Sequence, residues 1–185
     1  MSDHCETFYT VGGVEIRRRT AALPLERPLD LLLEKLTTNR GAIFASGYEY
    51  PGRYSRWDIG FVDPPLELVA RQRGFTFRAL NARGGVLLEI LQAGLKGHPH
   101  LIELVLAGEE LRGSVAPMPA YFPEEQRSKQ PTIFSVMRAL VAQMRADGER
   151  HLGFYGAMGY DLVFQFEPIE LQHERAADQP DLHLF

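Results

Sequence analysis

The sequence predicts an α+β fold in which a largely antiparallel sheet is covered by helices. Runs of β-prone residues come in pairs separated by short turns, which is typical of antiparallel hairpins. Segments with helical periodicity follow these pairs without the strict strand–helix alternation of a doubly wound parallel sheet, which is the weaker option. A chain of 185 residues, 45% of them hydrophobic, is long enough to bury a core. We therefore expect a single domain over residues 1–185.

The first part of the chain is expected to form a hairpin, a helix and a strand. Two β-prone runs surround Gly12-Gly13, a pair typical of a two-residue primed turn. A helix should begin near Pro28, because the leucines that follow have helical spacing, and it should end before Gly41. Residues 42–45 are then predicted to form a buried strand that leads into a loop.

The middle of the chain predicts two further strand pairs with a helix between them. The first pair should turn near Gly74, and the helix should be entered through Gly84-Gly85. The second pair should turn around residues 107–110. Residues 118–131 are rich in proline and charge and have no periodicity, so we expect a surface connection there.

The clearest helix is "PTIFSVMRALVAQMRADG", which Pro131 can open and Gly148 can close. Its apolar stripe, expected to lie in the core, consists of Ile133, Val136, Met137, Leu140, Val141 and Met144. A strand should follow in "HLGFYGAMGYDLVFQFEP", and then a short helix that Asp161 caps and Pro168 ends.

The net charge and the cysteine content limit which partners and which cellular compartment we expect for this chain. The net charge is −4, so we expect neither nucleic acid nor an anionic membrane as a partner. The single cysteine, Cys5, excludes a disulfide framework and indicates a cytoplasmic setting. The first residues lack the pattern of a signal peptide, and no apolar run is long enough to span a membrane.

Local motifs give no catalytic or metal site. Gly153, Gly156 and Gly159 recur every third residue, which matches no phosphate-binding motif and is better explained by close packing of a strand. His98 and His100 could bind a metal, but no nearby residue completes a ligand set, and a solvated loop is the simpler interpretation. We therefore predict no catalytic and no metal-binding residue in this chain.

The loop after the first buried strand is the best candidate for a binding site. It contains aromatic side chains and the permanently charged side chains of arginines, which together suit a planar ligand that carries a carboxylate. The alternative is that its aromatic residues simply cover the end of a sheet. The residues concerned are Tyr48, Tyr50, Arg53, Tyr54, Arg56 and Trp57.

Several long runs resemble the N-terminal region of bacterial anthranilate synthase component I. The runs are "RGAIFASGYEYPGRYSRWDIGFVDPPLEL", "NARGGVLL", "PTIFSVMRAL" and "YGAMGYDLVFQFEP", and together they extend over nearly the whole chain. The resemblance is to the fused form, which carries its glutamine amidotransferase on the same polypeptide.

The resemblance implies a lyase of tryptophan biosynthesis that converts chorismate and glutamine into anthranilate, pyruvate and glutamate. In that family Mg²⁺ and chorismate bind in the C-terminal portion of component I, which this chain lacks. The implied partners are therefore the chorismate-binding region and the glutamine amidotransferase. The chain alone should be inactive.

The resemblance also implies half of a feedback site for L-tryptophan, an allosteric effector. The family has a strand ending in Leu-Leu-Glu-Ser, and the matching residues here include Phe44, Ala45 and Ser46. Ser46 takes the place of the serine that bonds the amino-acid head, whereas Ala45 departs from the glutamate. Arg56 lies where many members have a lysine.

Other interpretations stay open at this point. The chain could be a stand-alone module that binds an aromatic amino acid or a partner chain. It could also be the N-terminal region of a related chorismate-using synthase of phenazine or folate biosynthesis. An apolar surface meant for a missing portion would promote association, so we expect a homo-oligomer of the isolated chain.

Overall fold

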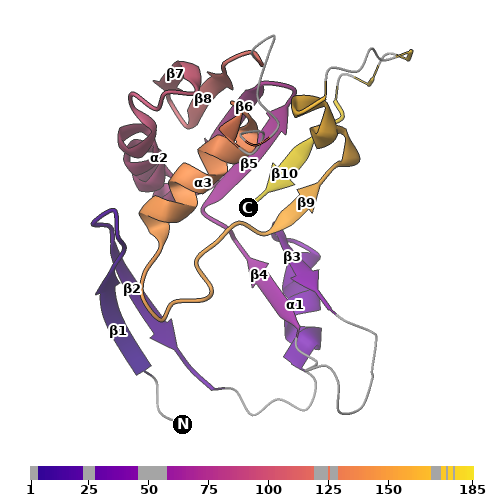
Figure 1. Cartoon of the computed structure of the whole chain (residues 1–185). Helices are drawn as coiled ribbons and strands as arrows, with labels where there is room; N and C mark the ends of the chain where they lie inside the picture. The colour runs from indigo at the N-terminus through magenta and orange to yellow at the C-terminus, as the bar shows by residue number, and fades with distance from the viewer. Residues whose placement is uncertain are drawn as a thin grey trace. The chain divides into compact units, whose positions relative to one another are not determined.

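The structure, a computed structural model, describes residues 4–22, 28–45, 58–118, 125, 129–167, 172–173, 175–176 and 178–185 (Figure 1). Its contacts divide the chain into two compact units, one made of Met1–His4 and Arg19–Pro64, the other of Cys5–Arg18 and Pro65–Phe185. The expectation of a single domain stays a prediction. Within the described residues, no helix is long and apolar enough to cross a membrane.

The elements alternate irregularly between strands and helices, as the sequence predicts. In chain order they are β1 (His4–Tyr9), β2 (Glu15–Thr20), α1 (Pro28–Leu36), β3 (Gly41–Phe44), β4 (Ile59–Val62), β5 (Leu66–Arg71), β6 (Gly74–Ala79), α2 (Ala82–Leu95), β7 (Leu101–Ala107), β8 (Glu110–Val115), α3 (Ile133–Met144), β9 (Gly156–Met158), the 3₁₀ helix η2 (Tyr160–Gln165) and β10 (Leu182–Leu184).

The main sheet has six strands in the order β7-β8-β6-β5-β10-β9. Every pairing described within it is antiparallel, so the predicted α+β class with a largely antiparallel sheet is confirmed. Both predicted strand pairs, β5–β6 and β7–β8, are present. Strand β10, which pairs with β5 and β9, has no local signal in the sequence. Three residues are too few to show a period of two, and only neighbours distant in sequence make them a strand.

The first hairpin is confirmed, but its turn is not the predicted two-residue type. Residues 10–14 connect β1 and β2, and of the glycine pair only Gly13 has a positive φ, at 80°. The tip is held by the end of α3, because Val11 N donates to Arg145 O at 2.7 Å and Gly12 N to Gln143 O at 2.8 Å. These carbonyls at the end of α3 need donors, which the longer turn supplies.

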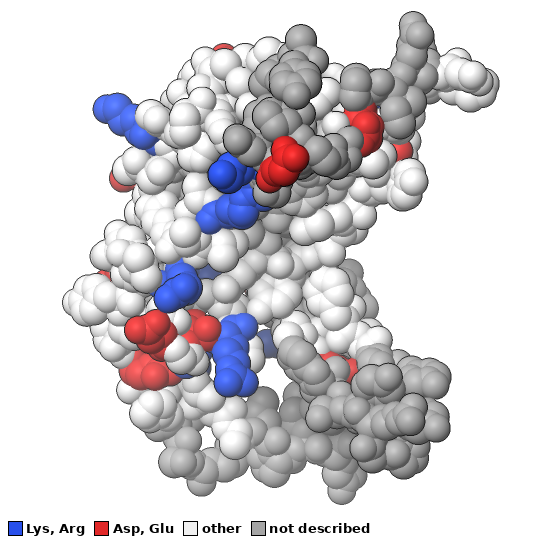
Figure 2. All heavy atoms as spheres, in the orientation of Figure 1, with Lys and Arg blue, Asp and Glu red and all other residues white. Residues whose placement is uncertain are grey.

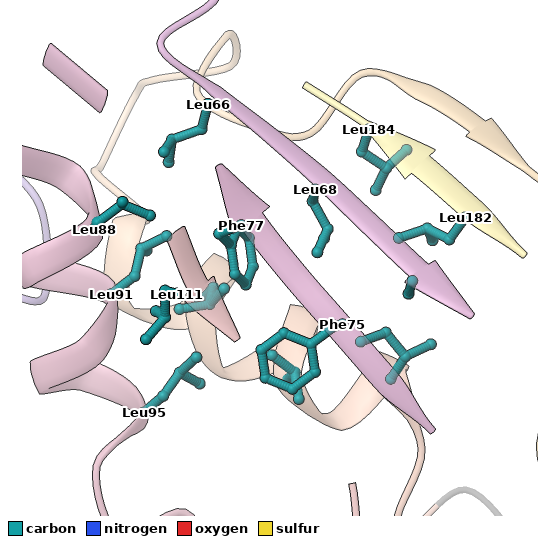
Figure 3. Packing of buried hydrophobic residues seen from close by; sticks show 14 of the residues in the cluster. Leu66, Leu68, Phe75, Phe77, Leu88, Leu91, Leu95, Leu111, Leu182 and Leu184 are labelled. Atoms are coloured by element: carbon teal, nitrogen blue, oxygen red, sulfur yellow. The ribbon is translucent and has the colours of Figure 1, made fainter. Parts of the chain in front are cut away.

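The core lies between the main sheet and the helices α2 and α3. Figure 3 shows leucines of α2 pointing toward Phe75 and Phe77 of β6, with Leu182 and Leu184 of β10 on the other side of the cluster. Phe77 is fully buried, and its ring lies edge-on to Phe75 with 5.8 Å between centroids. Burial of these apolar side chains is the main source of stability of this unit.

Helix α2 begins at Ala82, two residues before the predicted entry at Gly84-Gly85. Asn81 is its N-cap, with a side chain that accepts from Arg83 N at 3.1 Å and Gly84 N at 3.3 Å. Both glycines thus lie inside the helix. A Cβ on Gly84 would come within 2.1 Å of Pro65 O, so this glycine allows close packing of the helix on the strand ends.

Helix α3 is present as predicted, but its apolar stripe is narrower. Ile133, Val136 and Leu140 are buried, whereas Val141 is 51% exposed. Val141 is wrong as a core residue because it lies at the margin of the stripe on a 3.6-residue helix. The helix ends at Met144, so Gly148, with φ 76°, does not close it.

The predicted strand and short helix are present as β9 and η2, but Asp161 is not the N-cap of the helix. Gly159 precedes η2 as its N-cap, and the side chain of Asp161 instead pairs with Arg175 Nε at 2.7 Å. The predicted end at Pro168 lies outside the described residues, as does most of the predicted connection over residues 118–131.

Candidate effector site

The predicted effector site lies at one end of a small hairpin. Strands β3 and β4 pair antiparallel, with Phe44 opposite Ile59 and Gly41 opposite Val62. Ala45 therefore follows β3, and Asp58 precedes β4, at the same end of the hairpin. The connection between them, residues 46–57, lies outside the described residues.

Two glycines let helix α1 pack directly on this hairpin. A Cβ on Gly41 would come within 2.1 Å of Phe61 O and 2.7 Å of Leu36 Cδ2. A Cβ on Gly60 would come within 2.1 Å of Leu32 Cδ2. Leu32 and Leu36 of α1 thus lie directly against the backbone of these two glycines, where a side chain would not fit.

The strand β3 is half-buried rather than buried. Gly41, Ala42 and Ile43 have intermediate exposure, and Phe44 is 41% exposed. The prediction of a buried strand is wrong because a two-stranded hairpin covered by a short helix has too little surface around it to bury four residues.

Of the four predicted effector residues, the structure describes only Phe44 and Ala45. Both are exposed at the end of β3, and Ala45 offers no charged or hydrogen-bonding side chain to a ligand. Ser46 and Arg56 lie outside the described residues, as do Tyr48, Tyr50, Arg53, Tyr54 and Trp57. Their roles stay predictions.

The histidine pair is less exposed than the solvated loop that the sequence suggests. His98 and His100 are half-buried, and their rings meet edge to face with 5.4 Å between centroids. His100 Nδ1 lies 2.9 Å from Ser135 Oγ of α3. No local sequence signal connects these side chains, which are 35 residues apart, and the fold alone brings them together.

Other candidate clusters in the described residues give no acid, base or metal site. No three His, Cys, Asp or Glu side chains converge there in a way that could hold a metal ion. Glu110, which follows Glu109 at the β7–β8 turn, accepts hydrogen bonds from Arg112 and Arg78. These bonds, that from Arg112 first, lower the pKa of Glu110, so this carboxyl group is unsuited to act as a general acid.

Comparison with known proteins agrees with the resemblance predicted from the sequence. The fold is of the α+β class. The chain is 45% identical over 178 residues to an anthranilate synthase of Azospirillum brasilense, and the match covers 96% of this chain. It spans only 24% of the length of that curated relative. No protein-family model matches the chain.

The resemblance to anthranilate synthase is thereby confirmed along nearly the whole chain. About three quarters of the relative lies outside the match. The chain is thus a relative of one part of a longer enzyme.

Proposed function

We propose that this chain is the N-terminal regulatory and scaffold region of an anthranilate synthase. The complete enzyme converts chorismate and glutamine into anthranilate, pyruvate and glutamate, as a cytoplasmic lyase of tryptophan biosynthesis. The observation that carries the proposal is the 45% identity to an anthranilate synthase over 96% of the chain. The same identity favours this enzyme over the related chorismate-using synthases and over a stand-alone module.

The chemistry belongs, in this proposal, to parts of the protein outside this chain. The described residues offer no cluster of carboxylates and imidazoles for Mg²⁺. The chorismate-binding region and the glutamine amidotransferase fit the three quarters of the relative that the match leaves out. Our chain would act on catalysis only through its contacts with them.

The regulatory part of the proposal rests on the end of the β3–β4 hairpin. Ser46 directly follows Ala45 and Arg56 lies two residues before Asp58, so both residues are close in sequence to the paired strand ends. A serine hydroxyl can bond the amino-acid head of tryptophan, and an arginine can pair with its carboxylate. Ala45 removes one contact to the ammonium group, so tryptophan should bind more weakly than with glutamate at this position.

The test is tryptophan inhibition of the complete polypeptide, measured as anthranilate formation against tryptophan concentration. Ser46→Phe should block the pocket and abolish inhibition while activity without tryptophan stays near that of the parent. Arg56→Ala should weaken inhibition by about tenfold to a hundredfold, because a charge-assisted hydrogen bond contributes about 1.5–3 kcal/mol.

A matched control is Glu34→Phe, which introduces the same side chain on the exposed face of α1. This variant should be inhibited like the parent. If Ser46→Phe enzyme is inhibited as strongly as the parent, the hairpin end is not the effector site. If no variant and no parent form anthranilate from chorismate, the assignment to anthranilate synthase itself fails, so the two failures are distinguishable.

A further inference from the structure

An open cleft of about 580 Å³ lies where the connection between α2 and β7 meets the first turns of α3. Its lining residues are His98, Pro99, His100, Lys129, Ser135, Arg138 and Ala139. Four of these seven carry basic side chains, and none is acidic. This composition differs from the whole chain, which has a net charge of −4.

Hydrogen bonds around Ser135 set the tautomer of His100. The Ser135 hydroxyl donates to Gln130 O at 3.2 Å and accepts from Thr132 N at 3.3 Å. Its remaining lone pair can only accept, so His100 Nδ1, 2.9 Å away, carries a proton. When the imidazole of His100 becomes charged, its second proton lies on Nε2, which then acts as a second hydrogen-bond donor.

The neighbouring histidine has the opposite tautomer. His98 Nδ1 accepts from His100 N at 3.2 Å, so the proton of neutral His98 lies on Nε2. Burial, and then the nearby charge of His100, lower the pKa of His98. A positive charge on one imidazole thus opposes a positive charge on the other.

The surroundings of the histidines are also positive. Lys129 lies just before α3, and Arg138 is exposed on its second turn. Figure 2 shows Lys and Arg side chains gathered over the part of the surface where Figure 1 places α3, with an acidic side chain beside them. The N-terminal end of this twelve-residue helix adds the positive end of its dipole. Glu89, Lys96 and Glu103 line a second cleft, to which His98 also contributes.

We propose that this cleft binds a small oxyanion, a carboxylate or phosphate group, between the two imidazoles and the side chains of Lys129 and Arg138. An anion there would interact favourably with the basic side chains that line the cleft and accept the hydrogen bonds that the charged histidines can donate. This site lies in a different unit from the candidate effector site, and it does not depend on the proposed function.

Histidine-ring NMR of the 185-residue chain tests this, with inorganic phosphate and succinate as probes and sodium chloride at matched ionic strength as the reference. Phosphate or succinate should shift the ring signals of both histidines and raise the pKa of His98. Because binding then takes up a proton, affinity should increase as the pH falls through the range in which free histidine titrates, about 6.5. A response to phosphate alone indicates a phosphate ester, and a response to succinate alone a carboxylate.

Two variants separate a specific site from general attraction. Arg138→Gln should lower affinity about tenfold, because it removes a charge-assisted bond. Arg145→Gln removes an exposed arginine at the opposite end of the same helix and should change nothing. If neither anion shifts the histidine signals beyond chloride, or if both variants lose affinity equally, the site does not exist.

Discussion

The side chain of Gln165 shows how single buried polar residues join distant parts of the main unit. It is 3% exposed, and its Oε1 accepts from Ile133 N, the first N–H of α3, at 2.7 Å. Its Nε2 donates to Gln72 O in the β5–β6 turn at 3.0 Å. Arg73 donates to the backbone carbonyls of Gln165 and Pro131, and burial lowers the pKa of Arg73. The start of α3, η2 and this turn are thus fixed by polar contacts.

Replacing Gln165 by leucine should therefore destabilise the chain although the volume is similar. The change leaves the buried Ile133 N–H without its partner and removes the bond to Gln72 C=O, so the expected loss is about 1 to 3 kcal/mol in the free energy of unfolding. Urea unfolding followed by circular dichroism measures it. Gln179→Leu, at an exposed position, is the control and should have little effect. Equal midpoints for both variants would contradict the assignment.

At the scale of elements, the pairing of β9 with β10 depends on a glycine. Gly156 lies opposite Leu184, and a Cβ on Gly156 would come within 2.2 Å of His183 O and 2.8 Å of Leu184 Cα. Both contacts are with backbone, which cannot move without disturbing the ladder. Of the three spaced glycines, Gly156 has the close strand contact that their spacing predicts.

Gly156→Ala should thus weaken the edge of the main sheet. We expect a loss of about 1–3 kcal/mol in the free energy of unfolding, typical of overpacking. Faster hydrogen exchange at the amides of β10 should accompany it, because these residues lie between β5 and β9. Gly153→Ala is a matched control, since a Cβ there meets nothing within 4 Å. Unchanged exchange in Gly156→Ala would show that the strand can shift to admit a methyl group.

At the scale of the whole molecule, the two outer strands of the main sheet carry exposed apolar side chains. Ile102 and Val105 on β7 are 67% and 49% exposed, and Met158 on β9 is 55% exposed. Tyr160, just after β9, is 88% exposed. In the described part of the chain these strands have a neighbour on one side only, and such edges promote association.

We therefore expect the isolated 185-residue chain to self-associate, with a mass by light scattering that rises with concentration. Met158→Lys and Ile102→Lys should reduce this association, because inward or edge charges oppose strand pairing. Val86→Lys is the control, since Val86 is 62% exposed but lies on α2. A monodisperse monomer at all concentrations would overturn the expectation.

The sequence by itself determined the elements whose signal is local and the family to which the chain is related. The periodicity of α3, the turn signal near Gly74 and the paired β-prone runs predicted helices and hairpins that the structure contains, because these patterns reflect which face each segment buries. The quoted runs predicted the relation to anthranilate synthase that the identity confirms.

Only the tertiary structure decided the features that depend on distant neighbours. β10 is a strand because β5 and β9 supply its hydrogen-bond partners, and Val141 is exposed because the packing of α3 selects a narrower stripe. The basic cleft exists because the fold places His100 beside Ser135, 35 residues away. Contacts between residues that are distant in the sequence leave no local pattern in it. Such residues become neighbours only when the whole core forms.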